Sequence, residues 1–292
     1  MRQCVTSSLH DPQVARVLRG ATVAYLGVEA RRGPHVTPHR FTAADGRIWI
    51  IVPDRALKVR ALRKRPRAGV LIRGRDGRSV VITGTAEIHS LREPGEAVRA
   101  AFHLPSIAAA GASYAARNVT QMAGYAVDLL TMTRGSMPLD RVLIAIRPDT
   151  ATVLDEPDPA AAGGDTRWSD IADRLPSTVA PLLGTAGDAA LGWSTPNGPL
   201  VLPARWEPAG ARITVPTGVD LPRSAPASLT LDRSVGRRPT GFRGVVVQGA
   251  GDLAGGRVTL APRTASWWKG FETGSIAVDE PAPAGNALMA TA

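Results

Sequence analysis

The basic side chains of this 292-residue chain are concentrated between residues 54 and 78. This stretch holds ten Lys and Arg residues and two acids, Asp54 and Asp76. It therefore carries a formal charge of +8, against +10 for the whole chain. Arginine offers an oxyanion a planar fork of donors, and lysine offers a mobile point charge. On a helix, Arg55 and Lys58 would share a face near the first turn, where backbone amides and the helix dipole also favour an anion. The stretch predicts a phosphate-binding helix; a solvated basic helix without a ligand is the alternative.

The segments around this stretch are typical of strands. Short apolar or alternating runs are bounded by Gly, Pro and Asp-Gly pairs along much of the chain. The Asp-Gly pairs within 44–47 and 75–78 predict tight hairpins. Strands at this spacing indicate a mainly β protein with accessory helices, built on an antiparallel sheet or barrel. We expect the strand at 142–154 to close the first barrel.

Three segments are predicted to be helical. The first is 11–19, with Asp11 as its N-cap and a proline in its first turn. The second is 54–65, capped by Asp54 and ending before the next proline. The third lies in the Ala-rich stretch 92–135.

The chain repeats itself at a fixed offset of 165 residues. Three separated blocks match at this offset: 33–41 with 198–206, 79–88 with 244–253, and Leu26-Gly27 with Leu191-Gly192. The alternative, coincidental similarity between valine-rich strands, would not keep one register through all three. The chain is therefore predicted to be two copies of one module. We expect a first module at 1–154, a Pro- and Gly-rich linker at 155–174, a second, degenerate module at 175–280, and a disordered tail at 281–292.

The second copy lacks the basic helix. Its equivalent segment, 217–228, contains Pro222 and Pro226 and has Arg223 as its one cation. Proline inside a helix costs about 3 kcal/mol. We therefore expect one phosphate site in the chain rather than two.

The order and spacing of these blocks resemble those of a known superfamily. The segment from Val23 to Pro53 is followed by K-x-R-x-L-R-x-x-P-R from Lys58 and then by VVITGTAEI at 80–88. This series is similar to the pyridoxamine 5′-phosphate oxidase-like, flavin-binding split-barrel superfamily, including its flavin/deazaflavin oxidoreductase branch. The resemblance implies two tandem antiparallel split β-barrels that form a pseudo-dimer within one chain. It also implies a cofactor held between them.

The resemblance places candidate cofactor contacts on this sequence. The strand that lines the cofactor ring would contribute Thr37, Pro38, His39 and Arg40. The strand end and helix that hold the phosphate would contribute Ile51, Val52, Arg55, Leu57 and Lys58. The start of a further strand, near the polar edge of the ring, would contribute Arg78 and Ser79. The cofactor implied is FMN or a deazaflavin coenzyme, with haem a remoter alternative. The implied reaction is hydride transfer to or from a small organic substrate, and no acid–base residue stands out.

Aromatic residues near the end of the second copy are candidates for the facing wall. Trp267, Trp268 and Lys269 could stack on a planar ring or position a substrate. Because side chains alternate along a strand, only one of the two tryptophans can face the site. Interface packing is the alternative for the other.

Two other function classes remain open from the sequence. One is a flavin or haem protein without catalytic activity. The other is a polyanion or nucleic-acid binder that uses 54–78, but no Phe, Tyr or Trp lies in that stretch, which argues against single-strand binding.

The remaining composition excludes several kinds of site. One cysteine cannot form an internal disulfide or a cysteine-based metal cage, and it fits a cytoplasmic protein. On a strand, His35 and His39 would lie about 13 Å apart, too far to share a metal ion, so no metal site is predicted. No membrane segment is expected. We expect a monomer that forms its own pseudo-dimer, with further self-association left open.

Overall fold

The first half of the chain folds into a closed barrel of antiparallel strands. The computed structural model describes residues 5–6, 8–90, 93, 95–96, 103–118, 140–158, 168–234 and 241–278. The barrel runs in the order β2-β3-β4-β7-β6-β5, and β5 returns to β2. Its strands are β2 (Val23–Ala30), β3 (Gly33–Ala44), β4 (Arg47–Pro53), β5 (Arg67–Arg73), β6 (Arg78–His89) and β7 (Arg141–Asp155). The short strand β1 (Val5–Thr6) pairs with β7. As predicted, the strand that includes 142–154 closes the barrel.

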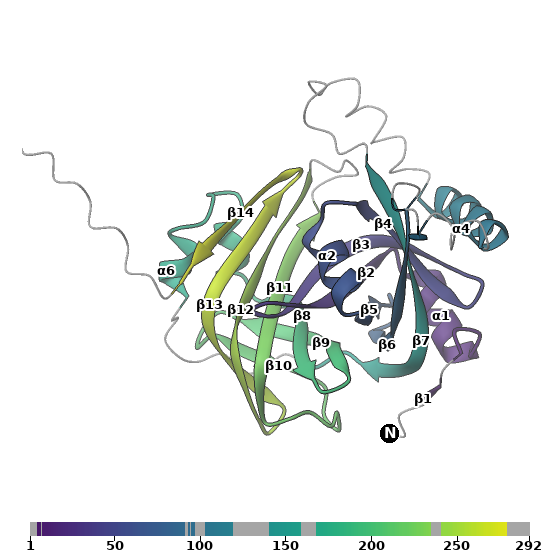
Figure 1. The fold of residues 1–292 in the computed structure, drawn as a ribbon. Coiled ribbons are helices and arrows are strands. Elements are labelled where there is room, and N and C mark those ends of the chain that lie inside the picture. The colour runs from purple at the N-terminus through teal and green to yellow at the C-terminus, as the bar shows by residue number, and fades with distance from the viewer. Residues whose placement is uncertain are drawn as a thin grey trace, which may run out of the picture.

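The second half repeats this topology. Its barrel runs in the order β8-β9-β10-β13-β12-β11, and β11 returns to β8. The strands are β8 (Gly187–Thr195), β9 (Gly198–Glu207), β10 (Arg212–Thr214), β11 (Ser224–Ser234), β12 (Phe242–Ala254) and β13 (Arg257–Lys269), with β14 (Glu272–Ala277) added beside β13. Figure 1 shows the two barrels side by side, the first in purple to teal and the second in green to yellow. The predicted fold class is confirmed.

The two barrels share their register as well as their strand order. Each has a β-bulge at a glycine, between Thr83 and Gly84 in one and between Gln248 and Gly249 in the other, which are 165 residues apart. In both, the glycine lies opposite a proline on the next strand. A Cβ on either glycine would collide with a carbonyl oxygen of that strand. The sequence repeat is therefore also a structural repeat, and it includes the position of the β-bulge.

The helices agree with the predictions in part. Helix α1 (Pro12–Gly20) is capped as expected, since the Asp11 carboxylate accepts hydrogen bonds from two backbone amides of the first turn. Helix α2 (Leu57–Lys64) begins three residues later than predicted, and the expected cap by Asp54 is wrong. The Asp54 carboxylate instead accepts from Arg63, one helix length away. Asp54 therefore forms an ion pair with Arg63 and does not cap the helix.

The remaining segments lie outside the two barrels or connect their strands. Helix α4 (Leu104–Arg117) covers the outside of the first barrel on β3, and the rest of the predicted helical stretch 92–135 lies almost wholly outside the described residues. The segment 215–223, between β10 and β11, contains no helix, as the prolines predicted. Short helices α6 (Ser169–Ala172) and η1 (Ala180–Leu182) precede the second barrel. The predicted tail at 281–292 and part of the linker lie outside the described residues.

The barrels pack through equivalent surfaces. β3 lies against β8, β11 and β12, and β9 makes the matching contacts with β2, β5 and β6. At the centre, Val36 packs against Gly192 and Val201 packs against Gly27. This isologous arrangement is that of a two-fold symmetric dimer. The chain thus contains a pseudo-dimer.

Candidate functional site

A chain of three polar side chains connects β3 to helix α2. The Lys58 amine lies 2.7 Å from Nε2 of His39, which in turn lies 2.9 Å from the Thr37 hydroxyl. These strand residues share the inner face of β3, because their partners on β2 belong to the core of the first barrel. The β3–β4 ladder reaches no further than Phe41, so the rest of β3 has no strand on that side and α2 can approach it. Lys58 therefore lies at the split in the barrel.

Burial shifts the pKa values of the lysine and histidines in this group of side chains. Desolvation lowers the pKa of Lys58 from its ordinary value to about 7. Desolvation and the nearby Lys58 amine lower the pKa of His35 to about 4, and the same causes hold the pKa of His39 well below its usual range. Neutral imidazoles cannot neutralise a cation. Within the described residues no carboxylate forms an ion pair with Lys58, so the site favours an added anion.

The outer face of the same strand meets the second barrel. The Arg40 guanidinium lies 5.6 Å from the ring centroid of Phe242 at the start of β12, and it donates to the carbonyl of Thr22. Its Nε is buried and has no hydrogen-bond partner among the described residues. No ion pair neutralises Arg40 in the part of the chain that the structure describes. This end of the interface thus combines an unpaired guanidinium with an aromatic ring.

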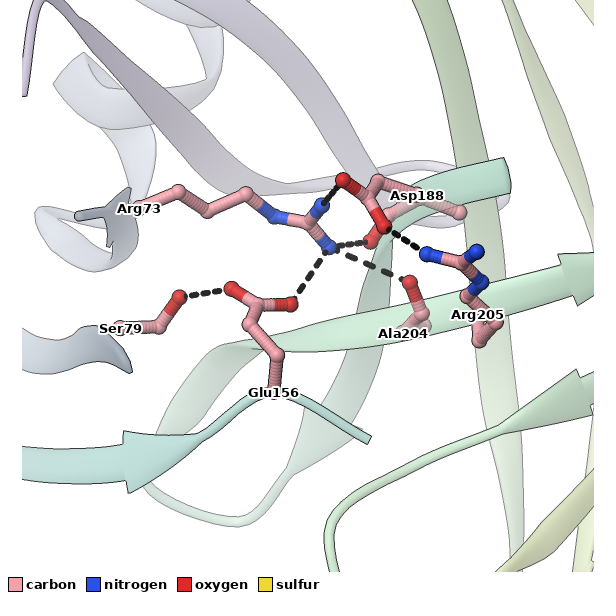
Figure 2. A network of polar contacts seen from close by, with 7 residues as sticks. Arg73, Ser79, Glu156, Asp188, Ala204 and Arg205 are labelled. Atoms are coloured by element: carbon pink, nitrogen blue, oxygen red, sulfur yellow. Dashed lines mark hydrogen bonds and ion pairs between the residues drawn. The ribbon is translucent and has the colours of Figure 1, made fainter. Parts of the chain in front are cut away.

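The related end of the interface is filled with ion pairs. Figure 2 shows the Arg73 guanidinium reaching from the first barrel to carbonyls and carboxylates around the second. Arg73 donates to the carbonyls of Ala189 and Ala204, and it lies 3.4 Å from both Asp188 and Glu156. In turn Arg205 pairs with Asp188 at 2.6 Å. Both arginines at this end are neutralised by carboxylates.

The pseudo-symmetry makes this contrast informative. Arg205 on β9 is the equivalent of Arg40 on β3, because each lies opposite the first residues of the preceding strand in the same register. The residue opposite Arg205 is Asp188, whereas the residue opposite Arg40 is Val23. One arginine therefore has a built-in counter-ion and its counterpart has none. The two ends of the interface are chemically different although the backbone repeats.

The structure separates the predicted cofactor residues into groups. Thr37, His39 and Lys58 are in contact, while Pro38 and Arg40 lie on the opposite face of β3. The Val52 side chain is buried in the barrel core, and Ile51 is partly buried. Arg55 is exposed and Leu57 is 40% exposed at the start of α2.

Two of the predicted residues, Arg78 and Ser79, lie at the ion-paired end of the interface. The Ser79 hydroxyl donates to Glu156, which also pairs with Arg73, as Figure 2 shows. Arg78 pairs with Asp76 in its own hairpin. The structure thus places Arg78 and Ser79 at the ion-paired end of the interface and not with Lys58.

The candidate wall residues divide as strand alternation requires. Trp267 packs against the core of the second barrel. Trp268 lies over Gly244 on the opposite face of the sheet, the face from which Gln248 donates to the Pro34 carbonyl of the first barrel. Lys269 is exposed at the end of β13.

Sequence reasoning missed several polar and aromatic groups of the interface. Phe242, Arg73, Glu156 and Asp188 were not candidates, because nothing local in the sequence distinguishes them. Aligning the repeat would have shown Arg40 matched with Arg205 and Val23 matched with Asp188. That difference in charge was the available signal.

Comparisons with known proteins give structural similarities alone. No family model and no curated protein matches the chain. Solved structures that resemble it include a conserved hypothetical protein of Mycobacterium tuberculosis, at 23% identity and a TM-score of 0.36 over 52% of this chain and 92% of that one. An F420 reductase shows 18% identity and a TM-score of 0.31 over 46% of this chain and 92% of that one. An FAD-binding protein of Mesorhizobium loti shows 18% identity and a TM-score of 0.35 over 52% of this chain and 97% of that one.

Each of these similarities spans about half of the chain, the length of one barrel. The predicted resemblance to split-barrel proteins is confirmed at the level of fold, and the strand order and closure described above carry that conclusion. Among the described residues, no helix is long and apolar enough to span a membrane.

Proposed function

We propose that the chain binds one flavin-type cofactor, FMN or a deazaflavin coenzyme, at the end of the barrel interface that contains Arg40 and Lys58. Bound there, such a cofactor would supply hydride transfer to or from a small organic substrate. The cofactor class rests on the sequence resemblance. Its position in this chain rests on the residues of the interface.

One observation carries the proposal: the two ends of a pseudo-symmetric interface differ in how their cations are neutralised. Arg73 and Arg205 are paired with carboxylates at one end. At the other end Arg40 has no such partner within the described residues, and neither has Lys58 on the inner face of the same strand. A cation held partly away from water without a counter-ion is unfavourable unless an anion joins it. This asymmetry supports one phosphate-bearing cofactor per chain.

The residues at this end suit the parts of such a cofactor. Lys58 would exchange its contact with His39 for a phosphate oxygen, and the first amides of α2, which no side chain caps, would donate to the same group. Arg40 has an unused Nε donor for a polar ring edge or a second anionic group. Phe242 offers an aromatic surface beside Arg40. Trp268 lies on the same face of the second barrel as Gln248, the face that contacts the first barrel. These residues bind and orient, and none of them is assigned as an acid or base.

The absorption spectrum of the purified protein, followed by titration with FMN and with a deazaflavin coenzyme, tests this proposal. Flavins absorb near 450 nm and deazaflavins near 420 nm, to the nearest ~10 nm, as properties of the cofactors themselves. We expect saturable binding of one equivalent per chain. A protein that is colourless and binds neither compound would refute the proposal.

Substitutions locate the site. Lys58→Ala should weaken binding at least about tenfold, because a charge-assisted contact to phosphate is lost. Arg223→Ala is the control, since Arg223 is the one cation in the segment that replaces α2 and its side chain is 86% exposed. Equal losses in both variants would mean that both barrels hold a phosphate.

A further inference from the structure

A separate hollow of about 210 Å³ opens at one end of the second barrel, between β11, β12 and the segment around η1. Its apolar wall includes Leu182 and Leu231, and its polar wall includes Thr178, Arg233 and Arg243. The proposed cofactor position, at Lys58 and Arg40, shares none of these residues. The hollow therefore needs an explanation of its own.

Two arginines of this wall lie directly opposite each other. Arg233 on β11 and Arg243 on β12 are ladder partners. Each lies two residues from a core residue of its strand, Leu231 and Val245 respectively, and therefore on the same face of the sheet. Like charges in such a pair are destabilising. Neither arginine forms an ion pair with a carboxylate in the described part of the chain. The pair thus carries two positive charges at the hollow without an internal counter-ion.

Buried polar atoms at the hollow also lack partners. Arg243 Nε and Thr178 Oγ1 are both buried and have no hydrogen-bond partner among the described residues. Leaving such a group unpaired costs about 1–3 kcal/mol. A donor of each kind, guanidinium and hydroxyl, is therefore available to an acceptor in the hollow.

The acids that also line the hollow are already engaged. Asp188 pairs with Arg205 and Arg73. Asp232 accepts a hydrogen bond from the Tyr25 hydroxyl of the first barrel, and burial raises the pKa of this carboxyl. Both lie on the outward face of their strands, opposite in direction to the two arginines. Asp188 is thus paired with arginines outside the hollow, and Asp232 with a hydroxyl of the first barrel.

The corresponding end of the first barrel is built differently in the described residues. The equivalent of Arg243 is Arg78, which pairs with Asp76, and the equivalent of Arg233 is Gly74. There α1 packs closely, so that a Cβ on Gly74 would contact Val17 of that helix at 3.4 Å. In the second barrel η1 has three residues where α1 has nine. The shorter helix leaves the hollow open, and two arginines lie beside it.

We propose that this hollow binds a small organic anion, whose carboxylate or phosphate is held by Arg243, Arg233 and Thr178 and whose apolar part contacts Leu182 and Leu231. The volume restricts the ligand to a molecule smaller than a nucleotide, since sites for drug-sized ligands are about 300–1,000 Å³. The site is independent of the cofactor and does not depend on the proposed function.

Calorimetric titration of the full chain with inorganic phosphate and, separately, with sodium butanoate tests the proposal at constant ionic strength. We expect saturable binding of at least one of the two probes, and which one binds decides between phosphate and carboxylate. Arg243→Gln should weaken that binding about tenfold or more. Arg257→Gln, the same change at an exposed position on β13, should leave it unchanged.

Lys58→Ala separates this site from the cofactor site, since inorganic phosphate could bind at either. Binding that persists in Lys58→Ala and is lost in Arg243→Gln supports the proposal. Absence of saturable binding by either probe, equal loss in Arg243→Gln and Arg257→Gln, or loss in Lys58→Ala alone would overturn it. The circular dichroism of Arg243→Gln should match that of the unchanged protein; if it does not, Thr178→Val provides the same test from the opposite wall.

Discussion

Val36 of the first barrel packs into the space left by Gly192 of the second, and Val201 packs in the same way against Gly27. A Cβ on Gly192 would lie 2.6 Å from Val36 Cγ2 and 2.6 Å from the Ser228 hydroxyl. The two contacts are related by the repeat, because both members of each pair are 165 residues from their counterparts. Two glycines thus let two strands approach at the centre of the interface.

Gly192→Ala should therefore destabilise the protein by about 1–3 kcal/mol, the usual cost of forcing an extra carbon into a packed interior. Gly187→Ala on the same strand is the matched control, because a Cβ there meets nothing within 4 Å. Urea unfolding would measure both free energies. Similar values for the two variants would show that the barrels do not pack as described.

The sequence was sufficient to predict this pairing of barrels but not its centre. The offset of 165 residues located β2 and β8 and aligned Gly27 with Gly192. The repeat alone does not say which surfaces meet. That depends on which side chains of β3 and β9 face outward and on the glycines opposite them, and these are properties of the folded pair.

Arg73→Ala should destabilise the protein far more than Arg78→Ala, although both remove a guanidinium from the same hairpin. Arg73 is largely buried, donates to two carbonyls of the second barrel and neutralises Glu156 and Asp188. Removing one partner of such a buried group typically costs about 3–5 kcal/mol. Arg78 pairs with Asp76 at the surface, which is worth about 0–1 kcal/mol. Thermal or urea unfolding of the two variants measures the difference, and equal losses would show that the Arg73 cluster does not hold the barrels together.

The structure brings some of the predicted site residues together and separates others. Lys58 was identified from charge and spacing, and the structure places it in contact with His39, another predicted residue. The resemblance grouped Arg78 and Ser79 with them, yet Ser79 contacts Glu156, which pairs with Arg73, and Arg78 pairs with Asp76. Which end of the interface a strand end reaches depends on how the two barrels pack, and the sequence does not show that.

Acid should destabilise the protein through His35. Its pKa is lowered to about 4, against an ordinary value near 6.5, so the unfolded chain binds more protons than the folded one between these pH values. Stability therefore falls as the pH is lowered through that window. We expect His35→Gln to reduce the loss by about 1–3 kcal/mol, a range that allows for the residue's partial exposure. The exposed His10→Gln variant is the control, and urea midpoints at pH 7 and pH 4 provide the measurement. An unchanged pH dependence in His35→Gln would contradict the assignment.

The affinity for the proposed cofactor should fall as the pH rises above 7. The free protein holds the pKa of Lys58 at about 7, because burial penalises its charged form. A bound phosphate favours the ammonium, so the pKa of Lys58 in the complex lies above that in the free protein. Between the two values, binding takes up a proton, and the dissociation constant should rise by up to about tenfold per pH unit. Lys58→Arg supplies a cation that stays protonated, so this variant should bind with little dependence on pH over the same range. Fluorescence titrations of FMN or the deazaflavin coenzyme at pH 6, 7, 8 and 9 would compare the two proteins. If affinity declined equally in both, the dependence would arise from another group, and Lys58 would not be the residue that holds the phosphate.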